Sequence, residues 1–348
     1  MNLHQASLYN SLLDIKMKFR LDLQVKKFNP AISHTQKILL IGSCFTENIG
    51  QKLEQYKFRV LQNPNGILFN PVSVTEAIST YVDNIRISVN SLFQYREGWH
   101  SWKHHSRFSD ITPEIAVENI NRSTANAHKF LKETDWLMIT LGSGWIYVLT
   151  ADAPSAKEGD IAANNHKGPS EWFHRRLMTE PEVLEKLKNM MQKLKSANHD
   201  LQVIFTISPV RHIREGVIEN NRSKAVLIQA VHELVNEYDN AHYFPAYELV
   251  IDDLRDYRFY AEDLVHPNYF ATQYVWEKFT DACFDDPTKQ LITELHDINL
   301  AFRHKPFNPG SAEHKKFLHT YFQKTKMLQE KFSYLDFSKE LEYFNREL

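Results

Sequence analysis

Three side chains of this sequence have the types and spacing needed for acyl-transfer chemistry. Ser43 stands just after a short apolar run, residues 38–41, and Asp263 and His266 lie far downstream, three residues apart. A carboxylate can hold a histidine in one tautomer, and that histidine can take a proton from a serine hydroxyl. The three residues would then form a catalytic triad in which Ser43 is the nucleophile.

The chain around Ser43 is predicted to turn directly from a strand into a helix. The apolar run 38–41 is typical of a strand buried on both faces of a parallel sheet, and residues 46–53 have the apolar spacing of a helix. Ser43 would lie at the carboxyl edge of that sheet, where open α/β folds bind ligands, and its own N–H could help to hold an oxyanion. The alternative is that Ser43 is only the N-cap of the helix.

The segment that carries Asp263 and His266 is predicted to be a loop. Pro267 disfavours the helical conformation for His266, and a new helix is expected to begin at Tyr269. A turn of this kind lets the Asp263 carboxylate reach Nδ1 of His266, while Nε2 faces the serine.

Cys44 is the other nucleophile on the turn after the first strand. Adjacent residues of a turn project in different directions. If Ser43 faces His266, the thiol of Cys44 is therefore expected to face the interior, as free cysteines usually do.

Several blocks of the chain resemble the GSCFA-domain family, which is similar to the SGNH (GDSL-like) hydrolases. The resemblance covers about residues 17–337. Its blocks are Gly42 to Phe45, Asn63 to Pro71, Thr140 to Ser143, Asn165 to Lys167, Ser208 to His212, Leu254 to Tyr260 and Asp263 to His266. Two positions depart from the usual residues of the family, because Thr46 stands in place of alanine and Asn165 in place of cysteine.

The resemblance implies a flavodoxin-like α/β/α sandwich with a parallel sheet, and a triad of Ser43, Asp263 and His266. It also implies that Gly66 and the Gly142 turn line the oxyanion site. The SGNH pattern has Gly-x-Asn at this turn, whereas this chain has Gly142, Ser143 and Gly144. The hydroxyl of Ser143 or the N–H of Gly144 is expected to replace the missing asparagine as a donor.

Three further residues are candidates for binding the substrate. Arg211 and His212 follow a predicted strand, residues 201–207, and the arginine would suit a carboxylate or phosphate group. An ion pair that holds the loop is the alternative role for Arg211. His166 can contact a substrate carbonyl or an anionic group, or it merely caps its loop.

The sequence divides into an N-terminal extension (1–16), an α/β domain (17–286) and a C-terminal helical extension (287–348). Within the α/β domain, residues 91–110 are predicted to form an inserted hairpin rich in aromatic residues and histidine. It would stack on a flat ligand, pack over the site, form a subunit contact or bind zinc through His100 and His104. The zinc alternative is disfavoured, and no metal or cofactor is expected. The C-terminal helices would dock on the sandwich or form a homodimer.

The composition excludes several classes of protein. The 41 basic and 43 acidic residues give a net charge of −2, which argues against nucleic acid as a partner. Two cysteines are too few for a disulfide framework. No apolar run is long enough to cross a membrane, and the first residues lack the plan of a secretory signal, so a cytoplasmic location is expected.

These observations predict a serine esterase that removes an acyl group, such as acetyl, from a carbohydrate or another small metabolite. Two alternatives stay open. An O-acyltransferase would use the same triad with a hydroxyl compound in place of water, and a ligand-binding protein would keep the fold without turnover.

Overall fold

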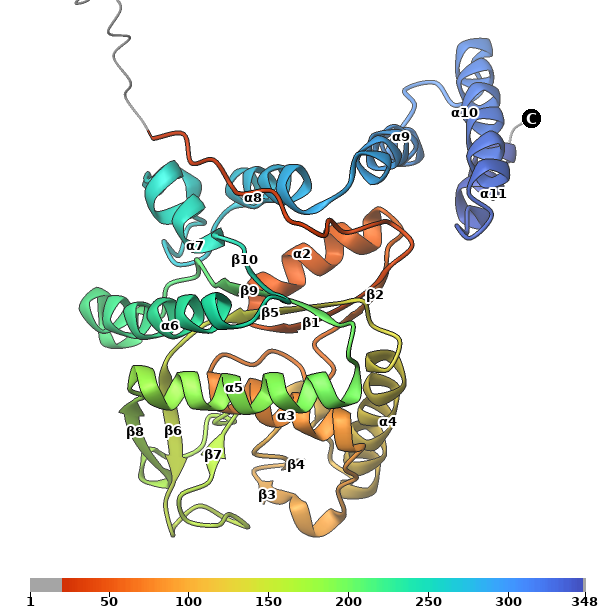
Figure 1. Ribbon diagram of the computed structural model, residues 1–348. Coiled ribbons are helices and arrows are strands. Elements are labelled where there is room, and N and C mark those ends of the chain that lie inside the picture. The colour runs from red at the N-terminus through yellow and green to blue at the C-terminus, as the bar shows by residue number, and fades with distance from the viewer. Residues whose placement is uncertain (1–20, 347–348) are drawn as a thin grey trace, which may run out of the picture.

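The computed structural model describes residues 21–346, so the predicted extension 1–16 lies outside the described residues. The centre of this part is a parallel sheet of β1 (Lys37–Gly42), β2 (Arg59–Gln62), β5 (Trp136–Leu141), β9 (Gln202–Ile207) and β10 (Ala241–Tyr243). The strands lie in the order β10-β9-β5-β1-β2 (Figure 1). This is the order of flavodoxin-like folds, so the predicted fold class is confirmed.

Helices cover both faces of the sheet (Figure 1). One face carries α2 (Cys44–Gln55), α8 (Tyr269–Cys283) and α9 (Asp286–Arg303), and the other carries α3 (Pro71–Asp83), α4 (Pro113–Leu131), α5 (Glu180–Ala197) and α6 (Val217–Glu237). Between β10 and α8 the chain forms the short helix α7 (Ala246–Glu248), which continues directly into a π-helical stretch (Leu249–Leu254).

Alternate residues of the central strands divide the core into two clusters. In β1, Ile38 and Leu40 pack beneath α2 and α8, whereas Leu39 and Ile41 pack against the helices of the opposite face. Successive side chains of a strand point to opposite faces, so a strand covered on both sides must be apolar at every position. The unbroken apolar run in the sequence therefore predicted this strand correctly.

The turn from β1 into α2 depends on Gly42. Its φ is +143°, and a Cβ at this position would lie 2.2 Å from the carbonyl oxygen of Thr140 in β5. A side chain cannot be accommodated so close to a neighbouring backbone. The chain then enters α2 at Cys44, two residues before the predicted start of the helix.

Two small antiparallel sheets are inserted into the sandwich. Within the segment 91–110, β3 (Phe93–Tyr95) and β4 (Gly98–His100) pair as a hairpin that is shorter than the predicted one, and a second sheet consists of β6 (Trp145–Leu149), β7 (Ile161–Ala162) and β8 (Phe173–Leu177). The rings of Phe93 and Trp102 stack at a centroid distance of 3.8 Å and pack against Phe173 of the second sheet. The aromatic residues of the hairpin thus form a small core of their own.

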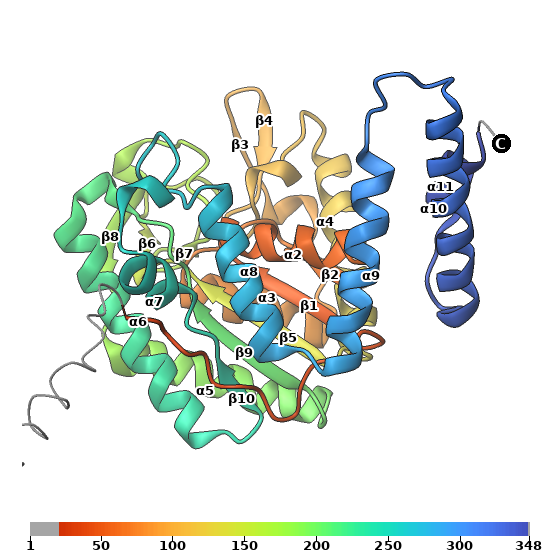
Figure 2. The ribbon, with the colours of Figure 1, turned by 90° about the horizontal axis from the view of Figure 1, so that it is seen from above.

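The C-terminal helices dock on the α/β part. These are α9, α10 (Ala312–Lys331) and α11 (Ser338–Asn345), and Figure 2 shows α10 and α11 side by side beyond α9. Phe337 and Phe344 are fully buried in the same cluster as Ile38 of β1, and Lys57 forms an ion pair of 2.8 Å with Glu340. Homodimer formation stays a prediction. Within residues 21–346, no helix combines the length and the apolar character needed to cross a bilayer.

Candidate active site

Asp263 and His266 form a hydrogen-bonded pair on the loop that precedes α8. Oδ2 of Asp263 lies 2.6 Å from Nδ1 of His266, while Oδ1 accepts the backbone N–H groups of Val265 and His266 at 2.9 and 3.0 Å. The N–H and the ring of His266, together with the N–H of Val265, lower the pKa of Asp263 to about 2. The carboxylate is therefore ionised at neutral pH and orients the imidazole.

The loop is held in place by its own backbone and by Arg211. The N–H of Ala261 donates to the carbonyl of His266 at 2.7 Å, which closes the turn. The guanidinium of Arg211 lies 4.1 Å from the ring centroid of Tyr260, and its Nη1 donates to the carbonyl of Leu264. Arg211 thus holds the loop through a ring and a carbonyl, rather than through the ion pair that the sequence suggested as an alternative.

A cavity of about 540 Å³ opens at the carboxyl edge of the sheet, beside this pair. Its wall includes Cys44, Asn70, Ser143, Arg211, His212 and His266. Cys44 follows β1 and Ser143 follows β5, the two strands between which the strand order reverses. Ligands of open α/β sheets bind at such a switch point, which makes this cavity the candidate active site.

Ser43 does not line the cavity. Its side chain is fully buried, and Oγ accepts the N–H of Phe45 at 3.3 Å as the N-cap of α2. The alternative role that the sequence allowed, a helix cap, is therefore present. Cys44 was expected to face the interior if Ser43 faced His266, and this condition is not met. Cys44 packs partly against the core, but it is also partly exposed and lines the cavity.

The N–H groups predicted to hold an oxyanion already have acceptors within the fold. The N–H of Ser43 donates to the carbonyl of Thr140 at 3.2 Å, and the N–H of Gly66 donates to the carbonyl of Asn63 at 2.7 Å. The N–H groups of Gly142 and Ser143 both donate to the carbonyl of Phe69, at 2.8 and 3.0 Å. The N–H of Gly144 donates to Ser223 Oγ at 2.7 Å. Gly66, Gly142 and Gly144 also do not line the cavity. The hydroxyl of Ser143 lies in the cavity wall, where it caps the N–H of Trp145 at 3.1 Å.

His212 lies in the cavity and His166 does not. Burial, with smaller effects of Lys224 and His266, lowers the pKa of His212 to about 4, and its Nε2 has no hydrogen-bond partner among the described residues. His212 is therefore neutral at pH 7. His166 packs among the aromatic rings of the hairpin region, where Nε2 lies 2.9 Å from the carbonyl of Ser101.

Sequence reasoning missed several residues around the cavity. Asn70 is part of the Asn63 to Pro71 block of the resemblance but was not a candidate site residue, and neither was Trp145, whose ring lies 3.8 Å from the guanidinium of Arg175. Lys224 is 1% exposed on α6, and Nζ donates to the carbonyls of Gly142 and Ser208 at 2.6 and 2.7 Å. A lysine at helical spacing from the buried residues Leu227, Val231 and Leu234 of α6 was the signal that could have found it.

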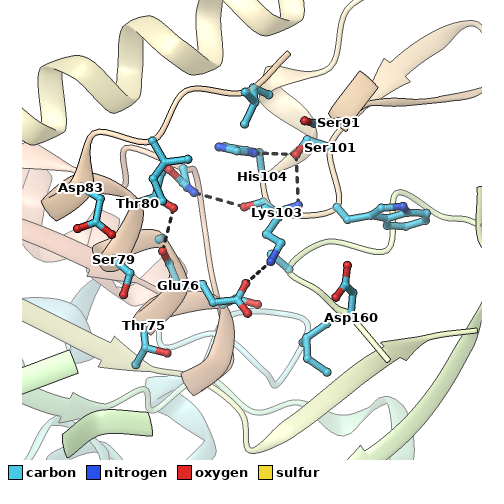
Figure 3. Close-up of a pocket in the computed structure, with 18 of the residues that line it drawn as sticks. Thr75, Glu76, Ser79, Thr80, Asp83, Ser91, Ser101, Lys103, His104 and Asp160 are labelled. Carbon is cyan, nitrogen blue, oxygen red and sulfur yellow. Dashed lines mark hydrogen bonds and ion pairs between the residues drawn. The ribbon is translucent and has the colours of Figure 1, made fainter. Parts of the chain in front are cut away.

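A second cavity, of about 670 Å³, lies between α3 and the segment that follows β4. The labelled side chains of α3, Thr75 to Asp83, lie across it from Lys103, His104 and Asp160 (Figure 3). An ion pair of 2.6 Å between Lys103 and Glu76 spans it. His266 and Cys44 do not line this cavity, so it is separate from the candidate active site.

His100 and His104, the two candidate zinc ligands, form hydrogen bonds with hydroxyl groups. Nδ1 of His100 lies 2.7 Å from Ser109 Oγ, and Nδ1 of His104 lies 2.8 Å from Ser101 Oγ. Among residues 21–346, no group of three or more histidine, cysteine, aspartate or glutamate side chains is placed to hold a metal ion.

The fold and the site define a class: an α/β sandwich of flavodoxin-like strand order with a histidine–aspartate pair at the carboxyl edge of its sheet. The GSCFA family matches residues 37–279, and the C-terminal domain of GSCFA domain proteins matches residues 295–348. The chain belongs to the GSCFA family.

Three solved structures are distantly similar. A Streptococcus pneumonia protein described as a platelet activating factor has 14% identity and a TM-score of 0.38, covering 80% of this chain and 90% of its own. A carbohydrate esterase of family 3 from Talaromyces cellulolyticus has 11% identity and a TM-score of 0.34, and the match covers 76% of this chain and 99% of the esterase chain. An acetyl xylan esterase from Butyrivibrio proteoclasticus has 10% identity and a TM-score of 0.36, and the match covers 76% of this chain and 65% of the esterase chain. No curated protein matches the chain.

Proposed function

We propose that this chain hydrolyses an ester of a small acylated metabolite or carbohydrate in the cavity beside His266. The observation that carries the proposal is the 2.6 Å hydrogen bond between Asp263 and His266 at the wall of that cavity. An ionised carboxylate on Nδ1 leaves Nε2 as the basic nitrogen, which is the arrangement of a general base. The nucleophile comes from the turn between β1 and α2, whose residue Cys44 lines the same cavity.

The residues that line the cavity suit a polar, ring-shaped substrate. The side chains of Phe69, Trp145 and Tyr147 supply aromatic surface, and Asn164 and Asn165 supply amide groups. Aromatic faces with adjacent polar groups suit a sugar ring. Arg211 adds a positive charge for a carboxylate or phosphate substituent.

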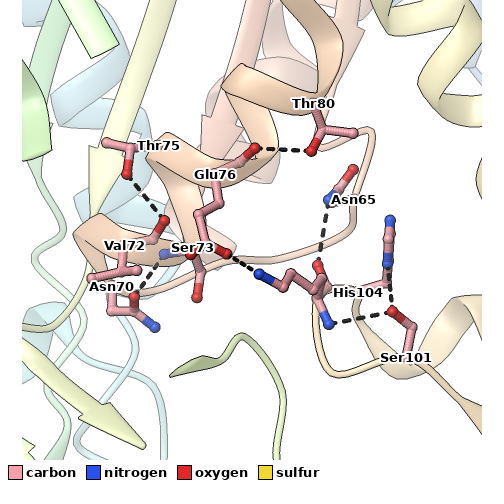
Figure 4. Close-up of polar contacts among 10 residues, drawn as sticks. Asn65, Asn70, Val72, Ser73, Thr75, Glu76, Thr80, Ser101 and His104 are labelled. Carbon is pink, nitrogen blue, oxygen red and sulfur yellow. Dashed lines mark hydrogen bonds and ion pairs between the residues drawn. The ribbon is translucent and has the colours of Figure 1, made fainter. Parts of the chain in front are cut away.

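The side-chain amide of Asn70 is our proposed oxyanion donor. Asn70 lines the cavity, and its Oδ1 accepts the N–H of Ser73 at 2.9 Å as the N-cap of α3 (Figure 4). This bond fixes the orientation of the amide and leaves Nδ2 as a donor. Asn70 can therefore supply the hydrogen bond for which the Gly142 turn has no asparagine.

Asn70→Asp should lower kcat by about 100-fold, the size expected for the loss of one oxyanion donor. Aspartate caps a helix as well as asparagine does, so the melting temperature should stay close to that of the unmodified chain. Steady-state kinetics and thermal denaturation measure the two quantities. Unchanged kcat in a stable Asn70→Asp variant would remove this residue from the mechanism.

The function is tested by screening 4-nitrophenyl esters of short acids and acetylated sugars, measuring nitrophenol and acetate release. Asp263→Asn should lower kcat/KM by about 100-fold, because the amide no longer orients and stabilises a protonated His266. Glu262→Gln makes the same chemical change at the neighbouring exposed residue and should leave the rate unchanged. Equal activity of both variants would refute the role of Asp263.

The occupied backbone N–H groups favour one alternative, a protein that binds such esters without turnover. That alternative predicts saturable binding of an acetylated sugar by calorimetry and no acetate release over hours. An acyltransferase would instead transfer the acyl group to an added hydroxyl compound faster than to water.

A further inference from the structure

The turn between β1 and α2 carries two nucleophiles, and only one of them reaches the cavity. Ser43 is 0% exposed, its N–H is bonded to Thr140 and its Oγ is used as the helix cap. Cys44 is partly exposed, and it lines the same cavity as His266. The geometry therefore favours the thiol over the hydroxyl.

The start of the helix explains this difference. Ser43 has an extended backbone, with φ −71° and ψ 175°, and its side chain folds back over the first turn of α2. Cys44 is the first helical residue, and side chains of a helix lean towards its N-terminus. Because the N-terminus of α2 lies at the carboxyl edge of the sheet, the side chain of Cys44 leans towards the cavity.

The charges around Cys44 fit a thiol that is activated by a base. Burial raises the pKa of the Cys44 thiol, and Glu47 acts in the same direction. The N–H groups of Cys44 and Phe45 and the ammonium of Lys224 oppose this shift. The thiol is therefore protonated at rest. When it loses its proton, the two N–H dipoles and the ammonium form of Lys224, whose pKa burial lowers to about 7, stabilise the thiolate. Within residues 21–346, the N–H of Cys44 has no acceptor on another residue, so it can also donate to an oxyanion.

We propose that Cys44 is the nucleophile of this site, with His266 as its base and Asp263 as the residue that orients the base. The inference rests on the proposed function and assigns its chemistry. His266 takes the thiol proton as Sγ attacks the ester carbonyl, and a C–S bond forms. The C–O bond to the alcohol then breaks, and His266 gives the proton to the departing alkoxide. Water, deprotonated by His266, cleaves the thioester, which releases the acid and restores the thiol.

Single substitutions on the turn separate the two nucleophiles. Cys44→Ala and Cys44→Ser should each lower kcat/KM by at least about 100-fold, because an alanine has no nucleophile and a serine hydroxyl is a much weaker one than a thiolate. Ser43→Ala should stay within about fivefold, because only a helix cap is lost. Ser43→Asp keeps a capping oxygen and has no hydroxyl, so it serves as a second variant if Ser43→Ala is unstable. Loss of activity in folded Ser43 variants together with full activity in Cys44→Ala would overturn the proposal.

Alkylation tests the thiol without any substrate. Iodoacetamide should modify Cys44 and spare Cys283, which is fully buried, and peptide mass spectrometry identifies the modified residue. The rate near pH 7 should fall by about tenfold in His266→Ala and should be unchanged in Glu262→Gln. If no ester is hydrolysed but this dependence on His266 is found, the proposed function fails and the cysteine–histidine pair stands. An alkylation rate independent of His266 would overturn the pair, even in an active esterase.

Discussion

Replacing His266 with alanine will lower kcat/KM for ester hydrolysis by about 10³-fold, within the range that general acid–base catalysis contributes. The imidazole of His266, which Asp263 orients, can both accept the proton of the nucleophile and return it to the leaving alcohol. The loss should be larger than for Asp263→Asn, because the side chain of Asp263 is 49% exposed and water can replace part of its effect.

Added imidazole should restore part of the activity of His266→Ala. The side chain of His266 is 51% exposed at the cavity wall, so a free imidazole can occupy the space left by the alanine. His199→Ala, which removes a histidine from an exposed surface position, is the matched control and should keep full activity. A His266→Ala variant with wild-type kinetics and an unchanged fold would contradict the base assignment and, with it, the proposed esterase.

The free energy of unfolding will fall by about 3 kcal/mol or more as the pH decreases from 7 to 4, because buried histidines must become protonated. Burial is the main cause that lowers the pKa of His104 to about 3 and that of His166 to about 4, and their side chains are 4% and 8% exposed. His212 adds to the effect in the same direction. In the unfolded chain these rings titrate near 6.5, so the unfolded state binds more protons between pH 6.5 and 4. Stability is therefore full above pH 6.5 and is lost below it.

Urea denaturation at pH 7, 5.5 and 4 measures this dependence. His104→Gln should show a smaller loss of stability between pH 7 and 4 than the unmodified chain, although glutamine lowers the stability at pH 7. Asp263 and Glu182, whose pKa values are lowered to about 2, add to the loss only near pH 4, where these carboxyl groups begin to be protonated in the unfolded chain. The same pH dependence in His104→Gln and in the unmodified chain would show that this histidine is not responsible.

Local sequence was sufficient for the central strands and for the histidine–aspartate pair. The apolar run of β1 could only be a strand covered on both faces, and Asp263 and His266 are three residues apart on a turn that Pro267 keeps out of a helix. Both features depend on neighbouring residues, so they can be inferred without knowing the rest of the fold.

The oxyanion site could not be predicted in the same way. The resemblance implied that Gly66 and the Gly142 turn line the oxyanion site, yet the N–H groups of these two glycines donate to Asn63 and Phe69. The carbonyl of Phe69 and the N–H of Gly142 meet only after the segments after β2 and β5 pack together. Which acceptor a backbone N–H finds therefore depends on the packing of segments that are distant in the chain.

The sequence by itself determined that this chain has a parallel α/β sandwich and a turn with a serine and a cysteine after its first strand, because strand periodicity and turn chemistry are local properties. Only the tertiary structure decided which side chain of that turn meets the cavity. The first turn of α2 uses the hydroxyl of Ser43 as its cap, and the packing of α2 on the sheet turns Cys44 towards the rim. It also decided that Lys224 ties the ends of β5 and β9 together through the carbonyls of Gly142 and Ser208, which lie 82 and 16 residues before it in the chain.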